Sequence, residues 1–450
     1  MKIQFIYLLP LVILSACSAE FLEVKPQKQQ VIVETLNDVT ALLDNSSSVM
    51  NLIDYWRLIS DGDLYYTADK LSSMYDFDRN LYLWKKDYDP SGLYTSAWDL
   101  PYQQIFYANI VIETIDDIKK RKGNELNWEN LYGRALFHRA WAHYHALQDF
   151  AEGFDMEVSF QLGIPIIKDS SFPKTTTRNS LMEVYEFILD DLDKAEELLP
   201  EQAEIKTRAS RQAVYSLKAR VYQNLNDYGS SLVNAEKALN ISNQLLDYNQ
   251  VSLTGGLPFS GFTYNTHPEI IFFASSNMPF VGIVGIEVAE DIRSSYEEGD
   301  IRKLAYFDDK GLYIGTYSGN AQYQFTGLSI DELYLVKAEC LVRLDRVDEG
   351  IDVLNTLLKN RYKSNQFTPI GHLQADKALQ LVLKERQKEL IGRGTRWTDL
   401  KRLNQMESTK IDLYRTYLGE TYMLPAKDSR YQFEIPKDEL EMSGLEPNVR

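Results

Sequence analysis

Cys17 is the residue whose sequence context most clearly predicts a chemical modification. It follows Leu-Ser-Ala at residues 14–16, and before these stand one charge, Lys2, and an apolar run from residue 3 to residue 14. A basic start and an apolar segment too short to span a bilayer are typical of a secretory signal. Small residues directly before a cysteine form a lipobox, in which the thiol receives diacylglycerol and the chain is cut before it. We therefore predict a signal peptide at residues 1–16 and a lipid anchor at Cys17, the alternative being an ordinary signal with a chance cysteine.

Other residues that could catalyse a reaction or bind a metal lack the spacing that such chemistry needs. His138 and His145 lie seven residues apart on one helical face, but the sequence holds no H-E-x-x-H motif. It also holds no G-x-S-x-G, P-loop or G-x-G-x-x-G motif, and no motif singles out a glycosidase pair among its 65 carboxylates. Cys340 lies in a helical pattern, where a buried small hydrophobe is the simpler interpretation. We expect no enzyme activity, no cofactor and no metal.

Residues 76–87 copy part of a calcium-binding loop. Asp76, Asp78 and Asn80 alternate as oxygen ligands would, and Asp87 stands at the twelfth position. Leu81 occupies the position where the sharp turn of such a loop requires glycine. We therefore do not expect calcium there.

Aromatic side chains are the best candidates for holding an uncharged ligand. The chain has 29 tyrosines and 6 tryptophans, and such rings offer a flat apolar face that can stack on a sugar together with a polar edge. Two irregular stretches, residues 54–96 and 252–327, place aromatics among Asp, Asn and Ser that could bond hydroxyl groups. The predicted ligand-binding residues are Trp84, Tyr82, Tyr75, Trp56, Tyr296, Tyr313 and Tyr317. The alternative for each is that it packs within its own loop. Trp98 is left out because its spacing to Tyr102 suits core packing, although it borders the first stretch.

The charge of the chain limits its partners. The formal net charge is −17 at pH 7, so nucleic acid and anionic lipid surfaces should repel the protein. We therefore expect partners that are neutral or that are recognised by shape.

Amphipathic helices dominate the predicted secondary structure. The apolar periodicity favours helices near residues 35–45, 97–120, 125–150, 180–199, 209–225, 228–242, 328–344, 347–362, 375–392 and 395–403. Strand patterns are scarce, the best being residues 269–275 and 431–435. The two irregular stretches are long for loops, so they should be functional or carry small elements of their own.

Two helical pairs repeat a pattern of small residues. Ala219 is followed twelve residues later by Ser231, and Ala338 twelve residues later by Gly350. A small residue on each of two antiparallel helices allows close packing, as in tetratricopeptide units. We therefore predict a mostly α fold, a tetratricopeptide-like helical-hairpin scaffold with long irregular loops and minor β-strands.

Several short motifs, read in order, resemble the SusD/RagB family of outer-membrane nutrient-binding lipoproteins. They lie at residues 21–26, 98–109 (W-x-x-x-Y-x-x-I-x-x-x-N), 134–144, 163–167, 178–200, 385–390 (ERQKEL), 396–402 (RWTDLKR), 435–440 (IPKDEL) and 447–449. The resemblance implies one such domain over residues 17–450, with an N-terminal part at about 17–250 and a C-terminal part at about 260–450. It also implies a place on the cell surface, over a SusC-like TonB-dependent barrel.

The motifs also have a purely architectural interpretation, which we favour. Within residues 385–402 acids and bases alternate at helical spacing, for example Glu389 with Arg393, and Trp397 could anchor the segment. Such pairs stabilise a helix by tenths of a kcal/mol each. The alternative is that this segment contacts the transporter.

Three functions remain open at this stage. The first is capture of oligosaccharide for the barrel partner. The second is capture of peptide by the same architecture, as in RagB-like members. The third is a lipid-anchored tetratricopeptide scaffold that binds only protein.

Overall fold

The computed structural model describes residues 33–450, apart from residues 87, 92–96, 123–127, 172–175 and 277–281. Cys17, the motif at residues 21–26 and Asp87 of the calcium-like loop lie outside the described residues. The predicted signal peptide and lipid anchor therefore stay predictions.

Long helices form a continuous row across the molecule. Each packs on the next in the order α5, α6, α7, α8, α9 and α12, and both α13 and α14 pack on α12. Helix α1 packs on α5 and α6 at the start of the row, and α15 packs beside α8. These ten helices are α1 (Leu36–Leu43), α5 (Asp99–Lys122), α6 (Glu129–Phe150), α7 (Leu181–Leu198), α8 (Arg211–Asn224), α9 (Tyr228–Ile241), α12 (Ile330–Arg343), α13 (Val347–Lys359), α14 (Ala375–Glu389) and α15 (Arg396–Leu403). All ten predicted helices are confirmed, and with them the mostly α fold class.

The ends of these helices are set by local side chains. At the start of α7, the Ser180 hydroxyl accepts from the Glu183 backbone N–H at 3.2 Å, and the Glu183 carboxylate accepts from the Ser180 N–H at 2.7 Å. This reciprocal capping box satisfies two N–H groups that the helix itself cannot satisfy. Asp227 caps α9 in the simpler way, accepting from the Ser230 N–H at 2.9 Å.

The predicted small residues allow close helix packing in both pairs. In α8 and α9, the Ser231 hydroxyl donates to the Ala219 carbonyl at 2.9 Å, so a side chain of α9 contacts the backbone of α8 directly. In α12 and α13, a Cβ placed on Gly350 would lie 2.9 Å from the Ala338 carbonyl oxygen. The tetratricopeptide-like pairing is confirmed at both sites.

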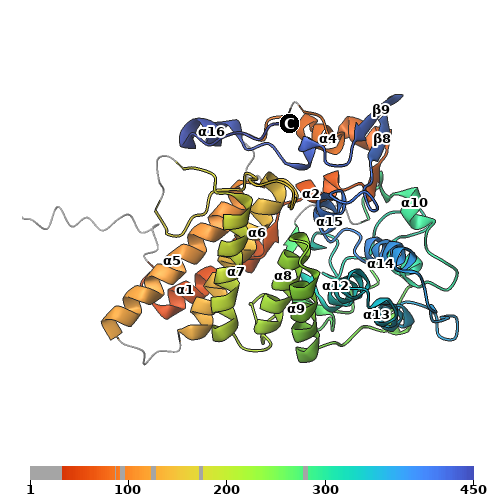
Figure 1. The fold of residues 1–450 in the computed structure, drawn as a ribbon, viewed down its shortest axis with the longest axis horizontal. Helices are drawn as coiled ribbons and strands as arrows, with labels where there is room; N and C mark the ends of the chain where they lie inside the picture. Colours follow the sequence, from red (N-terminus) through yellow and green to blue (C-terminus); the bar gives the residue numbers. More distant parts are fainter. Residues whose placement is uncertain (1–32, 87, 92–96, 123–127, 172–175, 277–281) are drawn as a thin grey trace, which may run out of the picture.

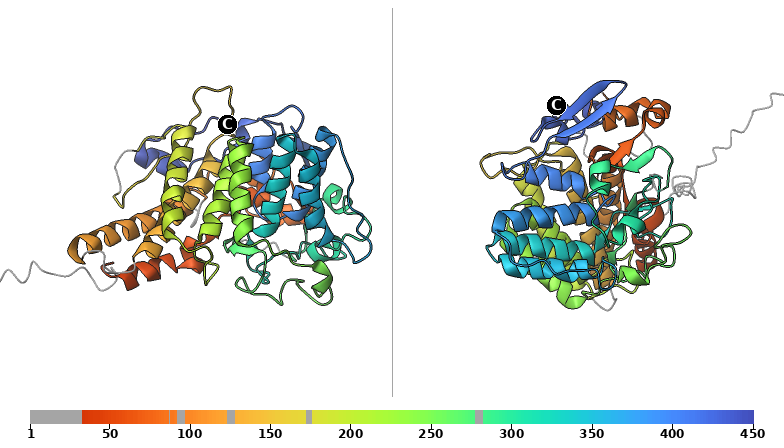
Figure 2. Two further views of the ribbon diagram at one scale, coloured as in Figure 1. Left: turned by 60° about the horizontal axis from the view of Figure 1, so that its bottom comes forward. Right: turned by 90° about the vertical axis from the view of Figure 1, so that its right-hand side faces the viewer.

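The irregular stretches carry small elements, as predicted. The first holds α2 (Trp56–Ser60), β2 (Leu64–Tyr66), α3 (Ala68–Ser73) and α4 (Asp76–Tyr82). The second holds β3 (Ile270–Phe272), β4 (Ser275–Ser276), β5 (Ile286–Val288), α10 (Glu290–Arg293), α11 (Arg302–Tyr306) and β6 (Gln324–Phe325). In the right-hand view of Figure 2 the helical row lies on one side and much of these stretches on the other.

Short strands join the irregular stretches to one another. Antiparallel β2 and β5 link the first stretch to the second, while β1 (Leu52–Ile53) runs parallel to β4, which pairs with β6. Antiparallel β3 and β7 (Leu328–Ser329) lead into α12. The predicted strand at 269–275 is thus present in part, as β3 and the start of β4.

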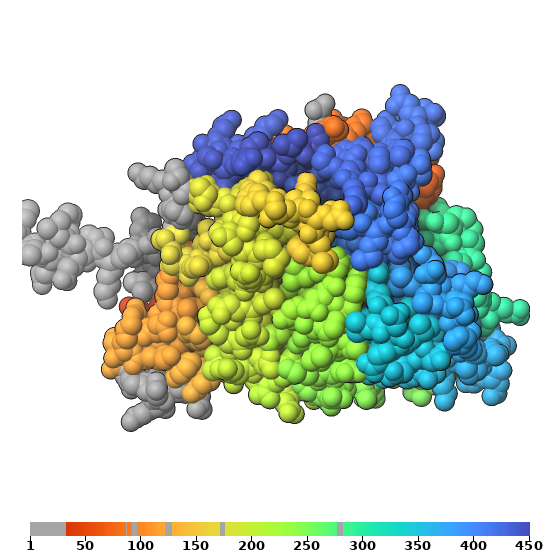
Figure 3. Space-filling model, viewed as in Figure 1, coloured from red at the N-terminus to blue at the C-terminus, as the bar shows by residue number. Residues whose placement is uncertain are grey.

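The C-terminal segment crosses the upper edge of the molecule (Figures 1 and 3). It contains the hairpin β8 (Leu413–Tyr417) and β9 (Glu420–Leu424) and the last helix α16 (Lys437–Ser443). The predicted strand at 431–435 is wrong, because this part begins in a 3-10 turn (Ser429–Tyr431) and continues extended with no strand partner among the described residues. Four of its five residues are buried, and Phe433 packs on Trp56 and Trp397.

Remaining short turns complete the described chain. They are a π-helical turn (Ser46–Met50) after α1 and a 3-10 turn (Tyr248–Gln250) after α9. Across the described residues, every helix is too short or too polar to serve as a membrane span.

Candidate functional site

Trp84, the leading predicted ligand residue, is buried. Only 2% of its surface is exposed, its indole N–H donates to the Ser60 carbonyl at 2.9 Å, and the Arg415 guanidinium lies 4.1 Å from its ring centroid. The prediction that Trp84 presents a face to ligand is therefore wrong for this structure. Its ring is part of the packing that holds the first irregular stretch together.

Five further predicted aromatics are buried as well. In the first stretch, Trp56 packs edge-on against Phe433 at 5.5 Å and Tyr82 packs on Tyr66 at 4.7 Å. In the second, Tyr296, Tyr313 and Tyr317 are at most 5% exposed. The expectation of exposed rings at these positions is wrong, because the rings pack into the main core, both on one another and on other parts of the chain.

Tyr75 is the one member of the predicted set that faces solvent. It precedes α4 and is 83% exposed. Its place as a ligand contact stays a prediction.

Three aromatic side chains line a groove at the start of α5. Trp98, Tyr102 and Phe106 follow at intervals of four residues, which puts them on one helical face. The Trp98 and Tyr102 ring centroids lie 4.7 Å apart, and Tyr102 and Phe106 are half-buried. We call the hollow that they line the α5 groove.

The α5 groove is walled by two other parts of the chain. One wall is the segment with Pro165, Ile167, Asp169, Ser171 and Thr176, and the other is α16 with the residues after it: Glu439, Met442, Ser443 and Leu445. The groove has a volume of about 620 Å³. This size and this mixture of apolar walls with a few polar groups are typical of small-molecule sites.

Side chains of the family-like motifs hold the first wall in place. The Tyr102 hydroxyl donates to the Pro165 carbonyl at 3.2 Å, and the Asn109 amide donates to the Asp169 carbonyl at 2.9 Å. Arg139 in turn donates to Asn109 at 2.9 Å and forms a two-pronged ion pair with Asp191 at 2.7 Å. Residues from four separate motifs therefore meet in one network beneath the groove.

Two carboxylates with different environments face the α5 groove. Burial, together with the nearby Asp99 and Asp438, raises the pKa of Glu439, although a hydrogen bond with Ser443 opposes the shift. Asp169 is exposed, and hydrogen bonds from the Ser171 hydroxyl and N–H lower its pKa. Both carboxylates can accept hydrogen bonds from ligand hydroxyl groups.

The expectation that Trp98 packs in the core is confirmed, because Trp98 is 4% exposed and packs edge-on against Phe150 with ring centroids 4.9 Å apart. The signal that our prediction missed is Phe106, which continues the four-residue spacing of Trp98 and Tyr102 and is half-buried. Helix α16 lies more than 330 residues after the aromatic residues of α5 in the sequence, so no local pattern could predict that it lines the groove.

Other hollows in the described residues are less suited to stacking. A hollow of about 580 Å³ lies between the two irregular stretches, with Lys70, Val284 and Leu312 in its walls, but none of its described lining residues is aromatic. A polar cavity near Arg57 and Arg393 has a volume of about 20 Å³, enough only for water. A third, polar pocket contains Lys206.

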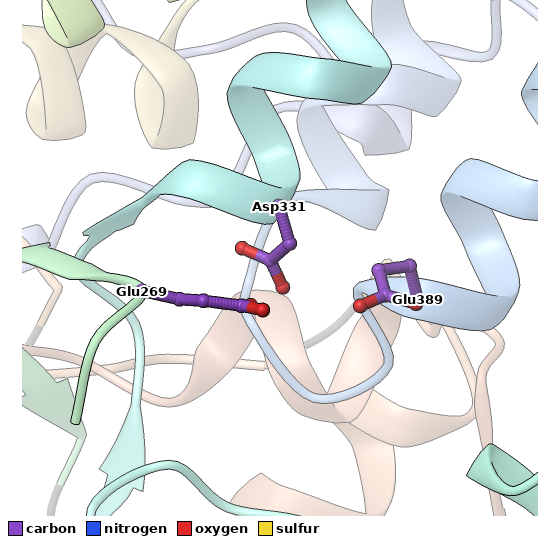
Figure 4. Close-up of side chains that lie close together, drawn as sticks. All are labelled: Glu269, Asp331 and Glu389. Carbon is purple, nitrogen blue, oxygen red and sulfur yellow. The ribbon is translucent and has the colours of Figure 1, made fainter. Parts of the chain in front are cut away.

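Three buried carboxylates converge at the centre of the C-terminal half. Oxygens of Glu269, Asp331 and Glu389 lie within 4.8 Å of one another, and Figure 4 shows the side chains pointing together. Arg361 donates to Glu269 at 2.9 Å and to Glu389 at 2.7 Å, and Arg393 lies 3.3 Å from Asp331. Because guanidinium groups already occupy these oxygens, the cluster is an internal ion-pair network and not a metal site.

The same network corrects one predicted ion pair. Glu389 bonds Arg302 at 3.0 Å and Arg361, whereas Arg393 bonds Asp331. The expected pairing of Glu389 with Arg393 is therefore wrong. Burial raises the pKa of Glu269 to about 7 despite its arginine partner.

The segment at 396–402 has the architectural role that we favoured. Trp397 is fully buried and stacks on Phe433 with centroids 5.4 Å apart. Arg402 pairs with Glu339 on α12 at 2.7 Å, and Arg386 pairs with Asp399 at 2.7 Å. These pairs are buried and join three helices.

Comparison with known proteins agrees with this architecture. Residues 20–223 match a family model described as starch-binding and associating with the outer membrane, and residues 302–441 match the SusD family model. The two matches together cover about three quarters of the chain.

Individual relatives match over most of their length. SusD-like protein P2 from Formosa agariphila is 23% identical, over 89% of this chain and 90% of the relative. A SusD superfamily protein from Bacteroides thetaiotaomicron has a TM-score of 0.74 at 17% identity, covering 92% of this chain and all of the other. A SusD-like carbohydrate-binding protein from Bacteroides vulgatus has a TM-score of 0.70 at 19% identity, covering 91% and 96%.

These matches decide the class of the protein. The matched family consists of non-catalytic binding proteins, in agreement with the expectation that this chain is not an enzyme. The order of the motifs along the chain, the helical row and both family matches lead to one assignment. This chain belongs to the SusD/RagB family of carbohydrate-binding proteins.

Proposed function

We propose that this protein captures oligosaccharide at the outer surface of the cell, in the α5 groove, and delivers it to a SusC-like TonB-dependent barrel. The family assignment supports a nutrient-binding role. The observation that carries the choice of site is the pair of half-buried rings, Tyr102 and Phe106, that faces two carboxylates, with the buried Trp98 packed against Tyr102.

The chemistry of the groove suits a sugar chain. Pyranose rings have apolar faces that stack on aromatic rings, and the half-buried Tyr102 and Phe106 offer two neighbouring rings for such stacking. Asp169 and Glu439 can accept from hydroxyl groups at the sides. Stacking and a few hydrogen bonds of this kind give weak binding, about 10–1000 μM, which allows a captured ligand to be released.

Two alanine variants test the site. Tyr102→Ala and Phe106→Ala should each weaken binding of an oligosaccharide found by glycan-array screening about tenfold, measured by calorimetry. Tyr414→Ala is the matched control, because Tyr414 on β8 is 62% exposed and lies outside the groove. Unchanged affinity in both groove variants would contradict the site.

Tyr75→Ala distinguishes the α5 groove from the first irregular stretch as the ligand site. If the first irregular stretch holds the ligand, this variant loses binding while Phe106→Ala keeps it. We expect Phe106→Ala to lose binding and Tyr75→Ala to keep it. A peptide-library hit combined with a blank glycan array would instead favour the peptide-capturing alternative.

The proposed location depends on Cys17. Acyl chains at about 0.8 kcal/mol per buried methylene hold a soluble domain on a membrane. Cys17→Ala should therefore leave the protein unprocessed or free in the periplasm, as shown by membrane fractionation. A variant that is still acylated and still in the outer-membrane fraction would contradict the anchor.

The proposed partnership is tested by purification. The protein should co-purify with a SusC-like barrel after extraction in mild detergent, and deletion of the barrel should abolish uptake of the captured sugar. Repeated recovery of a lone monomer, with uptake independent of any barrel, would contradict the partnership.

A further inference from the structure

A second large pocket lies apart from the α5 groove and shares no lining residue with it. Its volume is about 550 Å³, and all of its lining residues belong to the described chain. It is formed by the segment before α8, the residues after α9, the segment that leads into β3 and the start of α12. We call it the Lys206 pocket.

The backbone of Lys206 is fixed from both sides. Its N–H donates to the Asn265 side-chain oxygen at 2.9 Å, and its carbonyl accepts from the Phe273 N–H at 2.6 Å. The ammonium group donates to the His267 carbonyl at 2.6 Å. These three bonds hold the charged group at the wall of the pocket.

Lys206 has no carboxylate partner within the part of the chain that the structure describes. Neither Asp nor Glu lines the pocket, and the only cause of the pKa shift of Lys206 is burial, which lowers the pKa to about 8. Two buried lysines differ in this respect: Lys388 pairs with Asp300 and Glu385, and Lys218 pairs with Asp193. Buried Lys401 also donates to a backbone carbonyl, but the charges of Asp149 and Glu152 oppose the lowering of its pKa by burial. A partly desolvated cation without a counter-charge is a place where an anion is stabilised.

The rest of the pocket offers uncharged polar groups. Five amide side chains and several hydroxyl groups line it. Gln212 is buried, and the four exposed amides are Gln202, Gln244, Gln250 and Asn265. The Asn265 oxygen is used by Lys206, so its NH₂ group is left to donate outward. Amides both donate and accept, which is what a ring with several hydroxyl groups requires. Phe262 and Pro268 add an apolar surface.

We propose that the Lys206 pocket is a second binding site, and that it holds the carboxylate-bearing ring of a sugar acid. The carboxylate accepts from the Lys206 ammonium group, and the ring hydroxyl groups bond the surrounding amides. The preference for a sugar acid over other carboxylates rests on the carbohydrate-binding role proposed above.

Acylation of lysine gives a readout at the site itself. Only an uncharged amine reacts with an acetylating ester, so the full chain is treated at pH 8 and modification of Lys206 is followed by peptide mass spectrometry. Galacturonate and glucuronate should protect Lys206 with millimolar affinity, whereas galactose and glucose, which lack the carboxylate, should not. Protection should weaken as salt rises, because it depends on charge.

Variants then separate charge from shape. Lys206→Met keeps the apolar stem and should lower galacturonate affinity at least tenfold in calorimetry, while Lys206→Arg should retain part of it. Gln250→Ala should lower it severalfold without touching Lys206. Lys70→Met, at a lysine that lines a different hollow, is the control and should bind as the wild type does.

The outcomes are distinct from those for the α5 groove. Galacturonate binding that survives Tyr102→Ala and Phe106→Ala but not Lys206→Met supports the second site even if the groove proposal fails. Equal protection by galactose and galacturonate, no protection by either sugar acid, or unchanged galacturonate affinity in Lys206→Met would overturn the proposal.

Discussion

At the residue scale, Arg415 explains why Trp84 in the first irregular stretch is not available to ligand. Its guanidinium lies 3.6 Å from the Tyr82 ring centroid and 4.1 Å from that of Trp84, and it donates to the Ile59 carbonyl at 2.9 Å. A buried cation placed on two rings is stabilised by them and in turn keeps them in place. Trp84 is therefore a structural residue, in contrast to its predicted role.

Replacing Trp84 tests this structural role. Trp84→Ala removes a large buried side chain, so we expect a loss of about 3–5 kcal/mol in the free energy of unfolding, measured with denaturant. Tyr75→Ala is the control, since an exposed ring should change stability by less than about 0.5 kcal/mol. A Trp84→Ala protein as stable as the wild type would contradict the burial described here.

His143 gives a pH-dependent prediction at the same scale. Its ring is fully buried, its Nδ1–H donates to the Arg139 carbonyl at 2.8 Å and its Nε2 accepts from the Ile167 N–H at 3.3 Å. The bond to Nε2 requires the neutral ring, because a protonated Nε2 cannot accept, and burial lowers the pKa of His143 from 6.5 to about 3. Below pH 6.5 the unfolded chain binds a proton that the folded chain does not. Stability contributed by this group is therefore lost as pH falls.

The variant His143→Asn isolates this effect from all other titrating groups. Asparagine is neutral at every pH, so the destabilisation caused by the variant should shrink between pH 7.5 and pH 5, by about 2 kcal/mol. Denaturant curves of wild type and variant at both pH values measure it. His372→Asn, at an exposed surface histidine, is the matched control, and an equal His143→Asn deficit at both pH values would contradict the assignment.

At the element scale, Gly350 sets how closely α13 approaches α12. A methyl group there would lie 2.9 Å from the Ala338 carbonyl oxygen and 2.7 Å from a Val342 methyl carbon. Both neighbours belong to the facing helix, and a carbonyl cannot move without disturbing the helix that it belongs to. The pair therefore depends on glycine at this position.

Gly350→Ala should destabilise the protein by about 1–3 kcal/mol, because the added methyl group overpacks the contact between the helices. Gly229→Ala on α9 is a matched control, since its Cβ would meet only an Asp227 oxygen at 3.6 Å. Alanine favours a helix over glycine, so the control should be as stable as the wild type or more stable by up to about 1 kcal/mol. Equal effects of the two substitutions would show that helix propensity, not packing, determines how Gly350→Ala changes the stability of the α12–α13 pair.

The elements also show what sequence patterns could and could not predict. The ten long helices have a 3.6-residue apolar period, and the small residues at 219, 231, 338 and 350 marked their contacts correctly. The short helices α2, α3 and α4 have too few residues for a period to emerge, so they were missed. The wall that α16 gives the α5 groove and the stack of Arg415 on Trp84 both depend on contacts over hundreds of residues, which no local pattern contains.

At the scale of the whole molecule, the C-terminal segment closes the α5 groove. Arg178 donates to the Asn448 side-chain oxygen at 2.7 Å and to the Gly163 carbonyl at 2.7 Å. Asn448 in turn donates to the carbonyls of Phe433 at 2.7 Å and Phe150 at 3.0 Å. Figure 3 shows this last segment, in dark blue, lying over the earlier helices. The end of the chain thus clamps α16 against the wall that contains Pro165.

Release of this clamp should weaken ligand binding from a distance. Asn448→Ala removes three hydrogen bonds but touches no lining residue of the groove. We expect faster amide hydrogen exchange across α16 and a three- to tenfold loss of oligosaccharide affinity, about 0.6–1.4 kcal/mol. Val449→Ala, at a neighbouring side chain that is 82% exposed, should change neither quantity. If exchange in α16 rises while affinity stays at the wild-type value, α16 is not a wall of the ligand site. The binding surface would then be confined to the face of α5 and the segment with Pro165.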